Sequence, residues 1–188
     1  MVYVVALDGS SGRVVDAELL NIDELLDFPL TLPTPLSGQL PTPLVKLSGR
    51  GFPADYISIG SIDIVSERLK DTLLGHDPKI EFLTIQLYDR KGRPYRSEPY
   101  FFAHLLVEVD CIDRANSKLV VAEDGYVEDI IKLTLSDEAA SAEPVFWLGN
   151  TSCLPRWFVC DNLANEIIHG GFTGIKFDTI DKAVGRSR

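Results

Sequence analysis

The stretch IVSERLKDTLLGH at residues 64–76 is followed 94 residues later by a similar stretch, FVCDNLANEIIHG at residues 158–170. The apolar residues in each copy are spaced by three or four positions, which is typical of a helix with one buried face. Four apolar positions recur in both copies: Val65 with Val159, Leu69 with Leu163, and Leu73 and Leu74 with Ile167 and Ile168.

Each copy continues into an alternating segment. Ile80-x-Phe82-x-Thr84-Ile85 corresponds to Ile175-x-Phe177-x-Thr179-Ile180, which typifies a strand with one buried face. Ser66 or Asp161 can cap the start of its helix, and Gly75 or Gly170 with Gly171 can end it. The sequence therefore predicts two related strand-helix-strand units, at residues 57–87 and 154–180. Their helices are expected to bury the matched pairs Leu69 with Leu73 and Leu163 with Ile167.

Outside the repeat, other strands and turns are predicted from β-branched runs and turn residues. We expect a first strand at 2–7, a short strand and helical turn within 14–28, a long central strand at 101–112, a hairpin from 118–122 and 126–135, an acidic loop at 136–143, and a strand at 145–148. The hairpin turns at Glu123-Asp124-Gly125, because an Asp-Gly pair favours tight turns. The predicted fold class is α+β, a mixed sheet with two related strand-helix-strand units and a long central strand.

Six of the eleven prolines lie between Pro29 and Pro53, and the pentapeptide LPTPL occurs at 32–36 and again at 40–44. This segment is predicted to be an extended loop whose leucines pack on the core. A polyproline ligand is the alternative, but the prolines do not have the P-x-x-P spacing.

The chain has 188 residues and a formal charge of -10, from 18 basic and 28 acidic residues. This size fits a single α+β domain, residues 1–188, or two small lobes, 1–100 with the Pro-rich loop 29–53 and 101–188. The acidic balance argues against nucleic-acid and membrane-surface partners. Three cysteines, no C-x-x-C motif and no basic leader predict a cytoplasmic protein with reduced thiols.

Few side chains are candidates for catalysis. The three histidines lack metal-ligand spacing, and no phosphate loop or nucleophile elbow occurs, so we expect neither metal nor cofactor. His76 and His169 are explained as helix-terminal residues. His104 and Glu108 fall on one face of the predicted central strand and could pair as acid and base, although a structural histidine is the favoured interpretation.

Cys160 begins the second predicted helix, where the dipole can stabilise a thiolate. The equivalent residue in the first copy is Ser66, so a cap or core role is favoured. Asp113, Arg114 and Ser117 follow a buried strand. They fit either a binding pair or a turn with local hydrogen bonds, and the turn is favoured.

Several motifs are short, and their order along the chain carries the specificity. They are Pro53-Ala54-Asp55-Tyr56, Val65-Ser66-Glu67-Arg68-Leu69, Asp113-Arg114-x-x-Ser117, Val145-Phe146, the helix after Val159, and Thr173-Gly174-x-x-Phe177. Over residues 50 to 180 this order resembles the immunity proteins of bacterial polymorphic toxin systems. The sequence departs from that pattern at Cys160, where a serine is more usual, and in the Pro-rich first quarter.

The resemblance implies a non-enzymatic cytoplasmic protein that binds and blocks a cognate toxin domain. In such families the toxin is often a nuclease. An acidic inhibitor suits a nuclease because it can occupy a basic groove and associate quickly. Two other classes remain as alternatives. One is a small hydrolase or transferase using His104, Glu108 and Asp113, and the other is an adaptor module with several partners.

The candidate toxin-binding residues lie in the segment 123–143, which carries seven carboxylates against Lys132, giving a local charge of -6. One interpretation is a solvated surface that keeps the protein soluble. The other is a surface that faces a basic cleft on the toxin, with Tyr126 as an aromatic anchor. The residues concerned are Glu123, Asp124, Tyr126, Glu128, Asp129, Asp137 and Glu138, together with Glu143.

Overall fold

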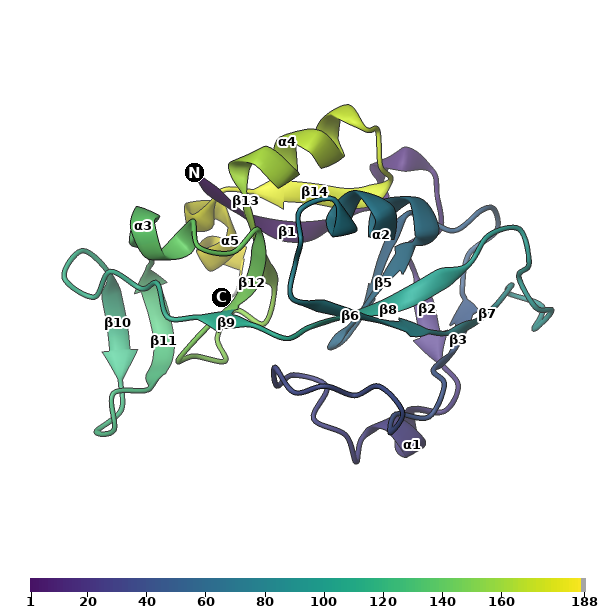
Figure 1. Ribbon diagram of the computed structural model, residues 1–188, viewed down its shortest axis with the longest axis horizontal. Helices are drawn as coiled ribbons and strands as arrows, with labels where there is room; N and C mark the ends of the chain where they lie inside the picture. Colours follow the sequence, from purple (N-terminus) through teal and green to yellow (C-terminus); the bar gives the residue numbers. More distant parts are fainter. Residues whose placement is uncertain (187–188) are drawn as a thin grey trace.

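The computed structural model describes residues 1–186 and has two main sheets beside each other, with two helices on one side (Figure 1). The first sheet has the order β4-β5-β8-β6, formed by Tyr56–Ile59, Ile62–Ser66, Tyr100–Leu105 and Ile80–Thr84. The second has the order β14-β1-β13-β12-β9, formed by Gly174–Asp178, Val2–Asp8, Trp157–Cys160, Val145–Leu148 and Glu108–Val109. The predicted α+β class is confirmed.

The predicted repeat is confirmed as two strand-helix-strand units. Helix α2 (Glu67–Leu74) connects β5 to β6, and helix α4 (Asp161–His169) connects β13 to β14. In each unit the two connected strands flank a third, antiparallel strand: β8 lies between β5 and β6, and β1 lies between β13 and β14. The first strand of the chain therefore occupies in the second unit the place that β8 occupies in the first. The repeat ends at Ile180, which begins helix α5 (Ile180–Arg186).

The two helices cover a shared core. The predicted buried pairs, Leu69 with Leu73 and Leu163 with Ile167, are all 2 % exposed or less. They pack in one cluster with residues from both sheets, including Val5, Val65, Leu105, Trp157 and Val159. At about 25 cal/mol for each Å² of apolar surface buried, such a cluster stabilises both units at once.

Smaller elements cover the remaining faces. A second apolar cluster joins the first sheet to helix α1 (Ile22–Leu25) and to a three-stranded sheet of β2 (Ala17–Leu19), β3 (Leu44–Leu47) and β7 (Gln86–Tyr88). A third cluster joins the second sheet to α5, to helix α3 (Asp137–Ala140) and to a hairpin of β10 (Lys118–Val121) and β11 (Val127–Lys132). A 3-10 turn, Gly9–Ser11, follows β1. In the described part of the chain, no helix has the length and apolarity to cross a membrane.

The Pro-rich segment is mainly an extended loop, as predicted, and it packs Leu30 and Leu36 on the core. Two side chains of the first sheet hold it. The carboxylate of Glu81 accepts hydrogen bonds from the backbone N–H groups of Leu36 and Ser37, at 2.7 and 3.0 Å. His104 donates from Nε2 to the Thr34 carbonyl at 3.0 Å. These bonds satisfy backbone groups that a loop without a sheet partner leaves free.

Two predictions of local structure are wrong. The long strand at 101–112 is divided, because β8 ends at Leu105 and the chain then leaves the first sheet to form β9, which pairs in parallel with β12 of the second. Residues 106 and 107 make the crossing, with Leu106 N–H bonded to the Lys79 carbonyl and the Val107 carbonyl bonded to Trp147 N–H. The acidic loop at 136–143 contains the helical turn α3.

The two sheets meet where β4 approaches the start of β14. Tyr56 N–H donates to the Thr173 carbonyl at 3.1 Å, and the next residue, Gly174, has a φ of 82°. A Cβ atom at position 174 would lie 2.2 Å from the Tyr56 carbonyl oxygen, well inside van der Waals contact. Glycine is therefore required there for both conformation and space.

Gly174→Ala is expected to lower the free energy of unfolding by roughly 2 to 5 kcal/mol, the sum of left-handed strain and overpacking. Gly125→Ala is the matched control, because Gly125 has a φ of 88° but an added Cβ there meets nothing within 4 Å. The left-handed strain alone should lower the free energy of unfolding of this variant, by about 1 to 2 kcal/mol. Urea unfolding of the two variants measures the difference, and equal losses would refute the close approach at Gly174.

Candidate functional site

The predicted hairpin is confirmed, and it carries most of the candidate binding residues. Gly125, in the left-handed region, closes its turn. Val127 and Ile130 are buried against the second sheet. The residues at 150 and 151 fasten the hairpin to the body: Asn150 donates from Nδ2 to the Gly125 carbonyl at 2.9 Å, and Thr151 donates from Oγ1 to the Val127 carbonyl at 2.9 Å. The hairpin is therefore held firmly at the surface.

The exposed side chains of this hairpin and of α3 include both acidic and apolar ones. Six of the candidate carboxylates are exposed: Glu123, Asp124, Glu128, Asp129, Asp137 and Glu138. Four apolar or aromatic side chains on the same hairpin are between 36 and 46 % exposed: Val120, Val121, Tyr126 and Ile131. We call these ten residues the acidic hairpin surface. Glu143, which the sequence places with them, instead pairs with Lys79 and is largely buried.

The Asp113-Arg114-x-x-Ser117 motif forms a turn between β9 and β10. The Asp113 carboxylate accepts hydrogen bonds from the backbone of Ala115 and Asn116 and from the Asn116 side chain, which together lower its pKa. Arg114 pairs with Asp110 at 3.1 Å. Ser117 Oγ donates to the Thr134 carbonyl and accepts from the Thr134 N–H. The local hydrogen bonds and the ion pair that the turn interpretation expects are therefore present.

The residues of the enzyme alternative are not assembled. His104 is fully buried, and burial lowers its pKa so that the ring is neutral at pH 7. Glu108 is exposed on β9, and Asp113 is used in its turn. Among residues 1–186 no hydrogen bond or ion pair joins any two of the three.

The other candidates are helix-terminal residues. His169 Nδ1 bonds the Asn165 carbonyl at 2.7 Å, and His76 Nε2 bonds Glu166 at 2.7 Å, which links the end of α2 to α4. Cys160 occupies the cap position of α4, but its thiol makes no capping hydrogen bond. Ser66 caps α2 as predicted, by accepting from Leu69 N–H at 3.2 Å. Over the described residues, no group of three or more His, Cys, Asp or Glu is placed to hold a metal.

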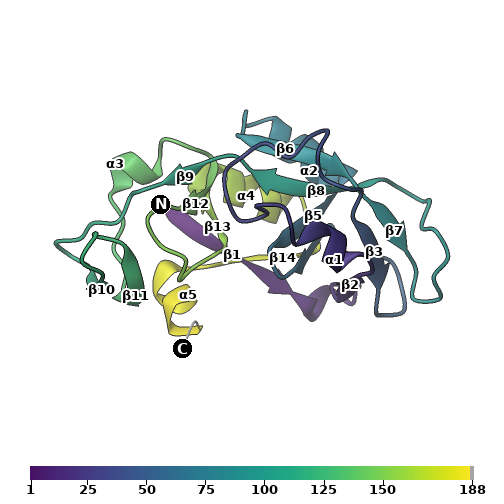
Figure 2. The same ribbon diagram turned by 90° about the horizontal axis from the view of Figure 1, so that it is seen from below.

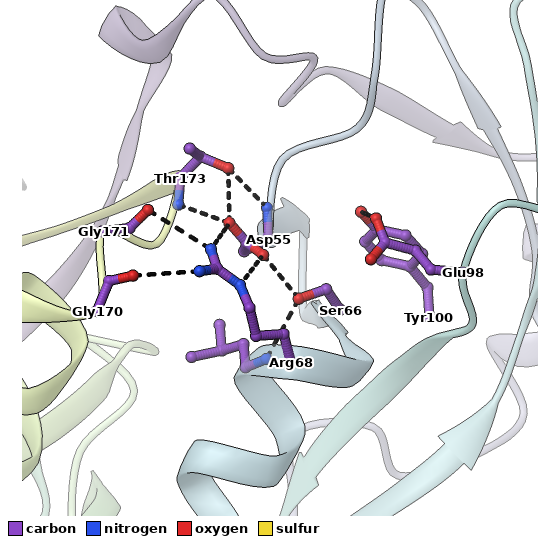
Figure 3. Close-up of polar contacts among 9 residues, drawn as sticks. Asp55, Ser66, Arg68, Glu98, Tyr100, Gly170, Gly171 and Thr173 are labelled. Atoms are coloured by element: carbon purple, nitrogen blue, oxygen red, sulfur yellow. Dashed lines mark hydrogen bonds and ion pairs between the residues drawn. The ribbon is translucent and has the colours of Figure 1, made fainter.

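A polar network that sequence reasoning did not single out lies between the two units (Figure 3). Its centre is Asp55, on the segment that leads into β4. The Asp55 carboxylate accepts from Ser66 Oγ at 2.9 Å, from Arg68 Nη2 at 2.9 Å, and from both the N–H and the Oγ1 of Thr173 at 2.8 Å. The Asp55 N–H in turn donates to Thr173 Oγ1 at 3.1 Å.

Arg68 extends this network to the end of α4. Its Nη1 donates to the Gly170 carbonyl at 3.1 Å, and its guanidinium lies 4.1 Å from the centre of the Phe172 ring. Carbonyls at a helix C-terminus lack partners within the helix, so a cation stabilises them. The network thus joins three of the motifs quoted above, those around Asp55, Ser66 and Thr173. Their order along the chain was the only sequence signal of this contact.

Burial raises the pKa of Asp55, but the hydrogen bonds from Arg68, Thr173 and Ser66 outweigh it and hold the pKa below its usual value. A carboxyl with a depressed pKa in the folded state stabilises the fold above its unfolded pKa. That stability is lost as the pH falls through the folded pKa. The network is therefore a stabilising link that depends on ionised Asp55.

Asp55→Asn is expected to lower the free energy of unfolding at pH 7 by about 1 to 3 kcal/mol, because the amide cannot accept all these bonds. The wild type should lose stability as the pH falls below about 4, and the variant should lose less over that range. Denaturant unfolding between pH 3 and 7 measures both. Parallel pH profiles for the two proteins would show that Asp55 contributes no ionised link.

A known protein family matches most of the chain. Residues 23–182 match the model of the immunity protein family (Imm11), which covers most of the chain. A search of curated proteins finds no match. The family match includes the Asp55 network, both repeat helices and the acidic hairpin surface, and the chain therefore belongs to the immunity protein family (Imm11).

Proposed function

We propose that this protein binds and neutralises a cognate bacterial toxin domain through the acidic hairpin surface, and that it does so without catalysis. The observation that carries the proposal is the presence of four exposed carboxylates and four exposed apolar or aromatic side chains on one firmly held hairpin, with two more exposed carboxylates on α3. Protein interfaces combine such features, since apolar and aromatic side chains supply affinity and charges supply orientation and speed.

The charge of the surface favours a basic partner. With a net charge of -10, the whole chain attracts a positively charged protein, and the hairpin concentrates that charge at one end of the molecule. A toxin that acts on nucleic acid has a basic groove for its substrate, because phosphates are bound by lysine and arginine. We therefore propose a nuclease as the toxin class, and the cytoplasm of the producing cell as the place of inhibition.

The Asp55 network supports this division of roles. It joins the two units inside the fold, and its bonds are satisfied within the chain. The acidic carboxylates of the hairpin mostly face solvent, with Asp124 and Asp129 accepting only backbone bonds from Tyr126 and Ile130 beside them. Groups without strong internal partners are the ones free to bind another protein.

Reversing two charges, Glu128→Lys with Asp129→Lys, should slow association with the cognate toxin domain by about ten-fold at low salt. It should also flatten the dependence of the association rate on ionic strength, and leave the unfolding free energy nearly unchanged. Stopped-flow or surface-plasmon kinetics at several salt concentrations measures these quantities.

The matched control is Asp23→Lys with Asp27→Lys, which makes the same charge change at exposed positions of and beside α1, far from the hairpin (Figures 1 and 2). If the two double variants slow association equally, only the net charge matters. If neither slows it, the acidic hairpin surface is not the interface.

A non-catalytic mechanism predicts that His104→Gln, Asp113→Asn and Cys160→Ser each keep toxin neutralisation wherever the variant is folded. Protection of cells that express the toxin is the assay, and circular dichroism confirms folding. A folded variant that binds the toxin normally but no longer protects would reveal a chemical step and contradict the proposal.

A further inference from the structure

Two adjoining cavities lie beside the first sheet: the lining of the first includes Tyr126 of the acidic hairpin surface, and the second is lined by residues of β1 and of the segment 153–156. The first measures about 370 Å³ and the second about 470 Å³. Both are lined by Asp63, Leu154 and Pro155, so Asp63 lies where they meet. Cavities of this size are large enough to enclose a side chain of a partner protein.

The Asp63 carboxylate has no counter-charge of its own. It accepts a hydrogen bond from Tyr56 Oη at 2.6 Å, and burial raises its pKa. Among residues 1–186 no cation lies within ion-pair distance of it, and the guanidinium of Arg156, which lines the second cavity, forms no ion pair. The indole N–H of Trp157 faces this carboxylate but is buried without a hydrogen-bond partner of good geometry. This polar cluster is only partly satisfied, which is costly inside a protein.

The rest of the first cavity has the chemistry of a site for a cation. Glu108 adds a second carboxylate, and the lining contains no lysine, arginine or histidine. The aromatic rings of Tyr126 and Trp147 form part of the wall, and Trp147 is held edge to face against His104 with 5.6 Å between ring centres. Carboxylates with aromatic faces bind a cationic head, while leucine side chains accommodate its aliphatic stem.

We propose that the first cavity receives a basic side chain of the bound toxin domain, with Asp63 and Glu108 as its counter-charges and Tyr126 and Trp147 packed beside it. This inference rests on the proposed function, because Tyr126 belongs both to the cavity and to the acidic hairpin surface. A toxin seated on the hairpin is thereby in place to insert one arginine or lysine. The cavity supplies specificity where the open surface supplies association speed.

The probe for the site is arginine blocked at both ends, N-acetyl-arginine amide, titrated into the full chain. The chain contains two tryptophans, so NMR shows two indole N–H signals, assigned with the Trp147→Phe variant. Both signals should shift with the blocked arginine. N-acetyl-citrulline amide, which has the same shape without the charge, should leave them in place. Equal shifts with citrulline would overturn the proposal.

Two variants and one control locate the binding. Asp63→Asn keeps an acceptor for Tyr56 Oη, and Glu108→Gln changes an exposed side chain, so both are expected to fold; each should abolish the shifts. Glu128→Gln, an exposed carboxylate on β11 outside the lining, is the matched control and should leave them unchanged. Shifts that persist in both cavity variants would place the cation elsewhere. Free arginine that binds more tightly than the blocked form would mark a metabolite site and refute a protein side chain.

The final measurement uses the cognate toxin domain. Asp63→Asn should weaken the complex by about ten-fold or more, mainly through faster dissociation, whereas the Lys reversals at 128 and 129 act on association. If the wild-type protein does not bind the toxin domain, the proposed function is refuted. The arginine titration then still tests the cavity by itself. Normal binding and dissociation of the Asp63→Asn variant would refute the cavity alone.

Discussion

The carboxylate of Asp55 is the contact on which the arrangement of the two units depends. It bonds Ser66 and Arg68 of the first unit and Thr173 of the second, so one side chain connects segments 118 residues apart. The close approach that it maintains leaves no room for a Cβ at Gly174. Because the chain folds back at this point, α2 and α4 lie over one core, and the loss of this link would expose apolar surface of both units.

The duplication separates the shared core from the segments that lie outside the repeat. Both repeat helices bury four of their matched apolar residues in the shared core, Leu69, Leu73, Leu163 and Ile167, whereas the matched Leu74 and Ile168 are exposed. The β10–β11 hairpin, α3 and the Pro-rich loop have no counterpart in the repeat, and they carry the acidic hairpin surface and part of the first cavity. The repeat thus forms the shared core, and the segments outside it supply the acidic hairpin surface and part of the first cavity.

Two partly buried carboxylates illustrate how environment assigns different roles to the same group. Asp55 has a cation and several hydrogen-bond donors, which outweigh burial and keep its pKa low. For Asp63 burial is the larger effect, the Tyr56 hydroxyl does not offset it, and its pKa rises. A carboxylate whose partners lie within the fold stabilises that fold, whereas one lacking a counter-charge gains most from a partner that brings one.

The sequence alone determined the features that depend on local pattern. Helical spacing at Leu69, Leu73, Leu163 and Ile167, the cap at Ser66 and the turn at Gly125 each follow from the preferences of neighbouring residues, and the structure has them as predicted. The alternating pattern from 101 to 112 correctly predicted strands. A local pattern does not determine which sheet a strand joins, so the sequence did not predict the crossing between sheets at residues 106 and 107. Only the tertiary structure decided that Asp55 bonds Thr173, that Glu143 pairs with Lys79, and that Asp63 lies between two cavities. These contacts arise when distant segments pack and their side chains compete for the same partners, which no local pattern encodes.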